Sequence, residues 1–194
     1  MVAATDLLVV AATARELASA LPCRTLLCGV GPVDAAARTS AALAEQRPRA
    51  LLHVGIAGAR RASGLGPAQL VIGTAARYAD LQVPDAFAPR ALAPDAALLE
   101  ALRRALPDAA TLPIATVGRV GASAASGVNC DVEAMEGFAV LRAAQLAGVP
   151  AIEVRAISNE IEETDRNRWH FDHAFAAITA VTPRLVEAIA TCVR

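Results

Sequence analysis

The chain has 194 residues, of which 55% are apolar and 19% charged, and its 18 basic and 19 acidic side chains nearly cancel. This composition is typical of a globular protein with a sizeable core and excludes a largely disordered chain. No cluster of basic residues occurs, so neither nucleic acid nor an anionic membrane surface is expected as the main partner. No apolar run reaches transmembrane length, and the apolar N-terminus lacks the basic segment of a signal peptide, so a cytoplasmic protein is expected.

Metal centres and disulfides are not expected either. Four cysteines occur along the chain, at Cys23, Cys28, Cys130 and Cys192. They show no CxxC spacing and no histidine cluster beside them, which predicts free thiols in a reducing compartment. His170 and His173 lie one helical turn apart without a third ligand, so no metal site is predicted.

Short apolar runs alternate with helical patterns, which is typical of βαβ units and a largely parallel sheet. Strands are predicted over residues 7–12, 24–28, 50–54, 70–79, 112–117 and 151–157. Helices are predicted over residues 15–21, 32–46, 94–106, 135–146 and 169–192, with a loop over 160–168 and either a loop or an irregular strand over 118–131. No repeat or linker interrupts this pattern. We therefore expect one α/β domain over residues 1–194, with three αβα layers around a mixed, largely parallel, twisted sheet.

Glycine turns are predicted directly after two of the strands, at Gly29-Val30-Gly31 and at Gly55-Ile56-Ala57-Gly58. Ligands bind at this end of the strands in parallel sheets, and glycine lets the backbone pass close to them. Neither turn carries the dinucleotide fingerprint, and the chain contains no GxxxxGK[ST] phosphate loop.

Two glutamates lie where a strand gives way to a helix. The position of Glu16, after the first strand, fits a solvated first-turn carboxylate as well as a functional group. Glu136 lies between Met135 and Gly137, among small and apolar neighbours. A carboxylate there is costly unless it is hydrogen-bonded, and a pair of sugar hydroxyls would satisfy it. Glu133 is expected to be peripheral.

A lone amide, Asn159, follows Ser158 at the end of the strand predicted over 151–157. The amide can form an Asx turn or contact a ligand, and its position alone leaves both open. If Glu136 and Asn159 lie on neighbouring strand ends, they can together hold a sugar and a heterocyclic base.

The chain resembles the nucleoside phosphorylase / methylthioadenosine nucleosidase superfamily over nearly its whole length. The resemblance is carried by Glu16, GVGPVDAA at 29–36, HVGIAGA at 53–59, VIGTAARYADL at 71–81, VEAMEGFAV at 132–140 and VRAISNE at 154–160. The tail SNEIEETDRNRW at 158–169 is most similar to that of the futalosine hydrolases, a hypoxanthine-releasing branch used in an alternative menaquinone pathway.

The resemblance implies an enzyme that cleaves the N-glycosidic bond of a purine nucleoside without a metal or an organic cofactor. It implies two catalytic residues, Glu16 as the base that activates water and Asn159 as the group that contacts the base of the substrate. The implied substrate-binding residues are Gly55, Ile56, Met135, Glu136 and Ser158. Because superfamily members commonly form homo-oligomers, a homo-oligomer is expected.

Two departures from the superfamily pattern refine this expectation. Asn159 replaces an aspartate of the adenine-specific nucleosidases, and amide N–H groups suit N7 and O6 of a 6-oxopurine. His53 and Ile56 stand where phosphorylases place an arginine and a serine that grip phosphate, which favours water as the nucleophile. These departures favour hydrolysis of a 6-oxopurine nucleoside, and the resemblance of the tail at 158–169 implies that this nucleoside is futalosine, with hypoxanthine as the released base.

Other functions remain open at this point. A methylthioadenosine/adenosylhomocysteine nucleosidase shares every motif except the base-contacting aspartate, and a purine nucleoside phosphorylase would need phosphate ligands. A non-catalytic nucleoside-binding protein would keep Glu136 without a reason to keep Glu16.

The aromatic carboxylate at the far end of futalosine also needs a partner. Arg155, Arg166 and Arg168 are candidates, the alternative being arginines paired with neighbouring acidic residues. Residues 118–131 are poor in the aromatic side chains that would stack on a base.

Overall fold

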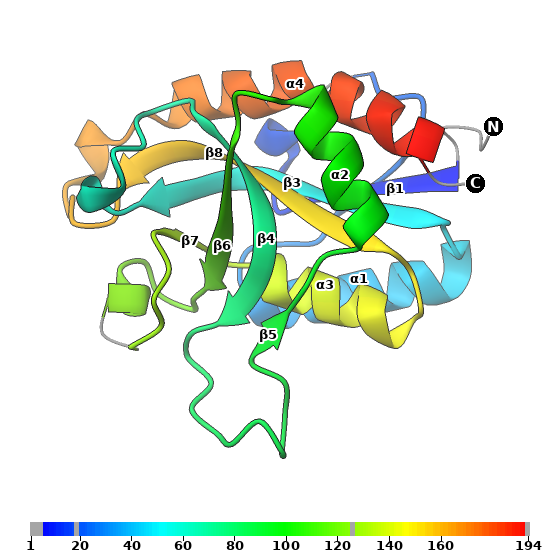
Figure 1. The fold of residues 1–194 in the computed structure, drawn as a ribbon, viewed down its shortest axis with the longest axis horizontal. Helices are drawn as coiled ribbons and strands as arrows, with labels where there is room; N and C mark the ends of the chain where they lie inside the picture. Colours follow the sequence, from blue (N-terminus) through cyan, green and yellow to red (C-terminus); the bar gives the residue numbers. More distant parts are fainter. Residues whose placement is uncertain (1–5, 18–19, 125–126, 193–194) are drawn as a thin grey trace.

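The computed structural model describes residues 6–17, 20–124 and 127–192 (Figure 1). The strands are β1 (Leu7–Ala11), β2 (Arg24–Leu27), β3 (Ala50–Ala59), β4 (Leu70–Tyr78), β5 (Ala91–Leu92), β6 (Ala110–Thr116), β7 (Val132–Ala134) and β8 (Ala151–Glu160). The α-helices are α1 (Pro32–Gln46), α2 (Ala96–Ala105), α3 (Gly137–Leu146) and α4 (Phe171–Cys192). Short 3-10 turns are η2 (Ala14–Glu16), η3 (Arg61–Ser63), η4 (Ala122–Ala124) and η5 (Arg166–Arg168).

The strands form one mixed sheet that curls and closes on itself. β2, β1, β3 and β8 are neighbours and run parallel. β8 also pairs antiparallel with β4, β4 pairs parallel with β6, and β6 pairs parallel with β7. β7 returns to β3 in antiparallel orientation, which completes a ring of five strands. The ring brings the C-terminal ends of β3 and β8 close to β7 and to the end of β6.

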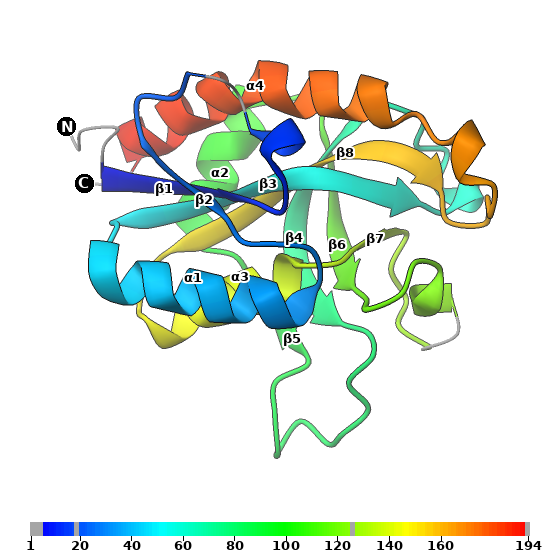
Figure 2. The same ribbon diagram turned by 180° about the vertical axis from the view of Figure 1, so that it is seen from behind.

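Helices cover both faces of this sheet. In Figures 1 and 2, α2 and α4 lie on one side, and α1 and α3 lie on the other. The first pair packs on a core that includes Leu52 and Val154, and the second pair packs on a core that includes Leu8 and Leu51. The α/β class and the helix–sheet–helix layering predicted from the sequence are confirmed.

The last helix, α4, is long and apolar, and one stripe of it packs against the sheet. α4 has 22 residues and is long and apolar enough to cross a membrane by length and composition. In the structure its apolar stripe, which includes Ile178, Leu185 and Ile189, is buried against the sheet. Burial against the sheet accounts for this stripe, whereas 28% of the most apolar 18-residue stretch of α4 is buried in all.

Two predicted elements differ from the structure near the site. The helix predicted over residues 15–21 is limited to the 3-10 turn η2, and residues 18 and 19 lie outside the described residues. The strand predicted to end at Val54 runs on to Ala59, so the glycines at 55 and 58 lie inside β3 rather than in a turn. Pairing with β8 on one side and β7 on the other extends the strand, an effect that local glycine propensity does not reveal.

Candidate active site

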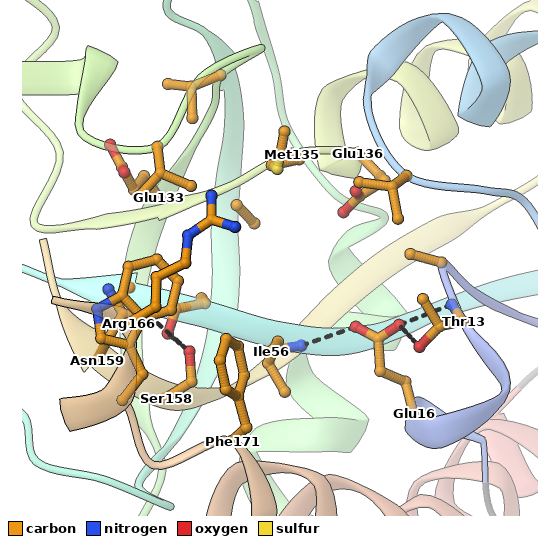
Figure 3. A pocket seen from close by; sticks show the side chains of 18 of the residues that line it. Thr13, Glu16, Ile56, Glu133, Met135, Glu136, Ser158, Asn159, Arg166 and Phe171 are labelled. Carbon is orange, nitrogen blue, oxygen red and sulfur yellow. Dashed lines mark hydrogen bonds between the residues drawn. The ribbon is translucent and has the colours of Figure 1, made fainter. Parts of the chain in front are cut away.

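A pocket of about 510 Å³ opens at the ends of these strands (Figure 3). All but one of the seven predicted site residues line it: Glu16, Ile56, Met135, Glu136, Ser158 and Asn159. The exception, Gly55, immediately precedes Ile56 on β3. Residues more than a hundred positions apart in the sequence thus converge because η2, β3, β7 and β8 end at the same edge of the sheet.

Glu16 is a buried carboxylate rather than a solvated one, with 4% of its surface exposed. Its Oε2 accepts hydrogen bonds from the backbone N–H and the hydroxyl of Thr13, at 2.8 and 2.9 Å. Its Oε1 accepts the backbone N–H of Ile56 at 3.2 Å. η2 is also tied to the last helix, because Arg15 pairs with Asp172 at 2.6 Å and stacks on Phe175. The carboxylate of Glu16 is therefore held in one orientation at the floor of the pocket.

Gly55 brings Glu16 close to a second charged group. A Cβ atom at this position would lie 2.3 Å from Arg155 Nη1 and 2.8 Å from Glu16 Oε1. Only a residue without a side chain allows a cation and a carboxylate to approach the backbone of β3 from two directions at this point. The sequence motif predicted a glycine here, but its physical reason is this close approach rather than a turn.

Arg155 is fully buried beneath the pocket and forms the centre of a charged network. Its Nε donates to Glu153 at 3.1 Å, and its Nη2 lies 3.0 Å from His53 Nδ1. Its Nη1 is 3.7 Å from Glu136 and makes no protein hydrogen bond. Burial alone would lower the pKa of the guanidinium, but Glu153, Glu136 and Glu16 together raise it. Burial and the nearby Arg155 charge lower the pKa of His53 well below its usual value, so the imidazole is neutral at pH 7.

Glu136 lies at the junction of β7 and α3 with 5% of its surface exposed. Its Oε1 accepts the backbone N–H of Gly31 at 3.0 Å, which ties it to the predicted glycine turn after β2. Burial raises the pKa of this carboxyl, while Arg155 and the Gly31 N–H lower it in part. Met135 lies beside it and lines the pocket. A carboxylate in this setting has spare acceptor capacity toward the pocket.

Asn159 is buried at the opposite end of the pocket from Glu16 (Figure 3). Its Oδ1 lies 2.7 Å from the Ser158 hydroxyl, and its Nδ2 donates to the carbonyl of Glu160 at 2.9 Å. An amide nitrogen carries two hydrogens. One N–H of Asn159 is thus already used within the protein, and one remains for a ligand.

The expectation that Glu133 is peripheral is wrong. This residue is 3% exposed and lines the pocket from β7. Its carboxylate accepts hydrogen bonds from the Gly121 N–H and from the hydroxyl and backbone N–H of Ser123. Glu133 therefore fixes the glycine-rich segment after β6 over the site. The ring closure that pairs β7 with β3 and β6 explains its burial, and no local pattern predicts that pairing.

The three arginines proposed for the far end of a substrate have separate locations. Arg155 is buried beneath the pocket and does not line it, and Arg168 pairs with Glu163 at 3.1 Å outside it. Arg166 lines the pocket itself, as does Arg119, which no sequence motif indicated.

Aromatic residues also line the pocket, although the segment 118–131 supplies none. Trp169, Phe171 and Phe175 line it from η5 and α4. Phe171 and Phe175 lie one turn apart at the start of α4, and this spacing is the sequence signal that the wall offered.

Metal-binding clusters of three or more His, Cys, Asp or Glu side chains do not occur within the described part of the chain. All four cysteines are free thiols, as predicted. Burial and the neighbouring Glu136 charge raise the pKa of Cys28, beneath the pocket, to about 12. A neutral thiol of this kind is an apolar packing group rather than a nucleophile.

Comparison with known proteins assigns the chain and its fold to a class. A model of the phosphorylase superfamily matches residues 18–194. In solved structures, the fold is similar to a 5'-methylthioadenosine/S-adenosylhomocysteine nucleosidase from Colwellia psychrerythraea in complex with adenine. The TM-score is 0.80 at 18% identity, covering 96% of this chain and 95% of that one. The fold is also similar to futalosine hydrolase of Helicobacter pylori, with a TM-score of 0.73 at 15% identity and 96% of each chain covered.

Relatives in sequence identify a family within this superfamily. A futalosine hydrolase from Acidothermus cellulolyticus is 34% identical over 183 residues, covering 80% of this chain and 74% of that protein. A futalosine hydrolase from Streptomyces coelicolor is 44% identical over 57 residues, a match that covers 29% of this chain and 24% of that protein. The chain therefore belongs to the phosphorylase superfamily, and within it to the family of the futalosine hydrolases.

Proposed function

We propose that this protein hydrolyses the N-glycosidic bond of futalosine and releases hypoxanthine and dehypoxanthine futalosine, a step of menaquinone synthesis. One observation carries the proposal. A single pocket brings together Glu16, Glu136 and Asn159, with an apolar Ile56 side chain where a phosphate would need a hydrogen-bond donor. The family relationship to futalosine hydrolases supports the choice of substrate.

Glu16 is proposed as the general base. Its Oε1 and the Nη1 of Arg155 both approach the backbone at Gly55, and this Nη1 makes no protein hydrogen bond. A water molecule bound between them would donate one hydrogen to the carboxylate and accept one from the guanidinium. Proton transfer to Glu16 then accompanies formation of the bond from the water oxygen to the anomeric carbon. A positioned base of this kind contributes about 10²- to 10⁴-fold to the rate.

Glu136 is proposed to hold the ribose. Its buried carboxylate would accept the two sugar hydroxyls, as Met135 packs on the apolar face of the ring. The ribose develops positive charge as the glycosidic bond breaks. Two buried carboxylates, Glu16 and Glu136, lie close enough to stabilise that charge.

Asn159 is proposed to act on the leaving group. The electron pair of the glycosidic bond passes to the purine, so negative charge builds on hypoxanthine as it departs. The free N–H of Asn159 donates to this purine, and a proton from solvent completes the neutral product. The Ser158 hydroxyl donates to the Asn159 Oδ1 at 2.7 Å, which leaves the amide nitrogen, rather than the oxygen, to face the purine.

A comparison of substrates tests the proposal. Release of free base would be measured by chromatography with futalosine, inosine and methylthioadenosine, in phosphate-free buffer. We expect futalosine to be hydrolysed with the highest kcat/KM. A preference for methylthioadenosine would assign the protein to the adenine-specific nucleosidases and overturn the role given to Asn159. No release from any of the three would support a non-catalytic nucleoside-binding protein.

We further propose that the protein acts in the cytoplasm as a homo-oligomer. Large apolar side chains are exposed at Val30 (60%), Val33 (79%) and Phe87 (83%). Phe87 lies on the long connection between β4 and β5, which projects from the body of the molecule (Figure 2). Burial of such side chains between copies would remove them from water. Light scattering coupled to gel filtration measures the mass directly, and a mass of 19.9 kDa, that of one chain, would contradict the proposal.

A further inference from the structure

We propose that Arg166 is a specificity-determining residue that donates hydrogen bonds to the 6-oxo group of the departing purine. This inference rests on the proposed function and deepens it, because it assigns a second donor to the base. It also replaces the expectation that Arg166 meets the carboxylate at the other end of futalosine.

The orientation of the nucleoside follows from the residues that hold it. Glu16 and Glu136 lie toward one end of the pocket, and Asn159 lies toward the other (Figure 3). The anomeric carbon and the sugar hydroxyls belong near the two carboxylates, so the base extends toward Asn159. Arg166 lies on the Asn159 side, and its guanidinium points into the pocket (Figure 3). The residue is therefore placed for the base rather than for the ribose.

The segment that carries Arg166 is fixed over the strand end. The backbone N–H of His170 donates to the carbonyl of Ser158 at 2.7 Å, which closes the loop after β8. The Trp169 indole N–H donates to the Glu163 carbonyl at 3.0 Å. The guanidinium carbon of Arg166 lies 5.5 Å from the centre of the Trp169 ring, within the range of cation–π contact. The Arg166 side chain thus faces the pocket, while the hydrogen bonds of the loop and the Trp169 ring hold the residue in place.

Asn159 alone does not satisfy a 6-oxopurine. Hypoxanthine presents two adjacent acceptors, N7 and O6, along one edge. Asn159 offers only one N–H, because the other is bound to the Glu160 carbonyl at 2.9 Å and its oxygen faces Ser158. An acceptor that loses its hydrogen bonds to water on binding and gains none from the protein weakens binding. A second donor is required, and it must come from the same end of the pocket.

Arg166 is free to supply that donor. Several other surface arginines form ion pairs, as Arg168 does with Glu163 and Arg61 with Glu160. Within the described residues, the Arg166 guanidinium forms no ion pair, although the pocket contains the carboxylates of Glu16, Glu133 and Glu136. A guanidinium carries only donors. It therefore suits the oxygen of hypoxanthine and repels the amino group of adenine, and its charge stabilises the purine anion as it leaves.

Binding of free bases tests the assignment without depending on futalosine turnover. Affinities for hypoxanthine and adenine would be measured by titration calorimetry on the wild type, Arg166→Met and Arg166→Lys. Methionine keeps the packing of the stem and removes every donor. Arg168→Met, in the same turn but paired with Glu163, is the matched control. Thermal unfolding of each variant confirms that the fold is retained.

We expect the wild type to bind hypoxanthine more tightly than adenine. Arg166→Met should weaken hypoxanthine binding by about 10- to 100-fold, the range of a hydrogen bond to a charged group, and leave adenine binding within a factor of three. Lysine should restore part of the loss, because it keeps the charge but not the planar donors. Arg166→Met should lower kcat/KM by the same factor on futalosine and on inosine, because the two substrates share the base.

Three results would overturn the inference. These are unchanged hypoxanthine affinity in Arg166→Met, wild-type protein that binds adenine as tightly as hypoxanthine, and a loss on futalosine that inosine does not show. The last result would assign Arg166 to the aromatic carboxylate instead. The proposed function fails by a separate observation. If the wild-type protein leaves futalosine intact, the proposed function is wrong, whatever its affinities for the free bases.

Discussion

Glu16 Oε1 accepts a hydrogen bond from the backbone N–H of Ile56 at 3.2 Å, although forty residues separate the two in the chain. This contact holds the proposed general base against β3, at the point where the same strand has a glycine and the Arg155 guanidinium approaches. The nucleophilic end of the site is thus built on a strand rather than on a flexible loop. Its geometry leads to the following predictions.

Replacement of Glu16 by glutamine should remove turnover and preserve ligand binding. The amide keeps the size of the side chain but cannot accept a proton from water, so kcat should fall by about 10²- to 10⁴-fold. Affinity for hypoxanthine should stay within a factor of about three, since the base lies at the other end of the pocket. Glu100→Gln is the control, because Glu100 belongs to an exposed ion pair with Arg103 on α2. Full activity in Glu16→Gln would remove this residue from the mechanism.

A methyl group at Gly55 should damage catalysis more than folding. The Cβ of alanine would lie 2.3 Å from Arg155 Nη1 and 2.8 Å from Glu16 Oε1, so one of the two must move. Misplacement of a reacting group by about 1 Å costs on the order of 10²-fold in rate. Gly66→Ala is the matched control, because nothing lies within 4 Å of its Cβ position. Equal kcat values for the two variants would mean that the groups beside Gly55 do not act on the substrate.

Exchange of Asn159 for aspartate should weaken hypoxanthine release. A carboxylate oxygen would replace the N–H that faces the Glu160 carbonyl at 2.9 Å, and a negative charge would oppose the departing purine. The expected loss in kcat is about 10²-fold, comparable to the loss of a donor that stabilises developing charge. Asn167→Asp makes the same exchange on an exposed residue of η5. Wild-type rates in Asn159→Asp would show that selection of the base lies elsewhere.

Substrate affinity should fall on the acid side at a pH above the usual range of a glutamate. Burial raises the pKa of Glu136 above the ordinary value of a glutamate. Only the ionised form can accept both sugar hydroxyls, so affinity is present above the raised pKa and lost as the pH falls through it. Inosine affinity would be measured between pH 4.5 and 8 in the Glu16→Gln background, where substrate is not consumed.

The double variant with Glu136→Gln provides the control for that titration. It should bind inosine more weakly and without the acid step, since glutamine does not titrate. If the double variant shows the same acid step, another group is responsible for the titration. The first candidate is Glu153, which belongs to the same network around Arg155 and whose pKa is also raised by burial.

The class of fold, six of the strands and most of the residues that line the pocket could be predicted from the sequence. Short apolar runs fix the buried strands, and the residues at their ends carry the chemistry because strand ends share one edge of the sheet. Strand-end positions drew attention to Glu16, Glu136 and Asn159, and the family resemblance added Met135 and a role for Glu16; all four residues line one pocket. Their roles in catalysis remain predictions.

What the sequence did not reveal depends on contacts between distant segments. The closure of the sheet through β7 buries Glu133 and extends β3 past its glycines. The buried network around Arg155 could not be separated from a surface arginine, because its partners come from three different elements. Arg166 was identified as a candidate, but its place at the base end of the pocket follows only from the folded loop after β8.

The most direct test of the account is the phosphate dependence of hypoxanthine release from futalosine. The rate would be measured by chromatography in phosphate-free buffer and again with added phosphate, with the sugar product identified by mass spectrometry. We predict the same rate in both buffers and dehypoxanthine futalosine as the product. Release only when phosphate is present, with a phosphorylated sugar, would make the protein a phosphorylase and contradict the interpretation of Ile56 beside Glu16.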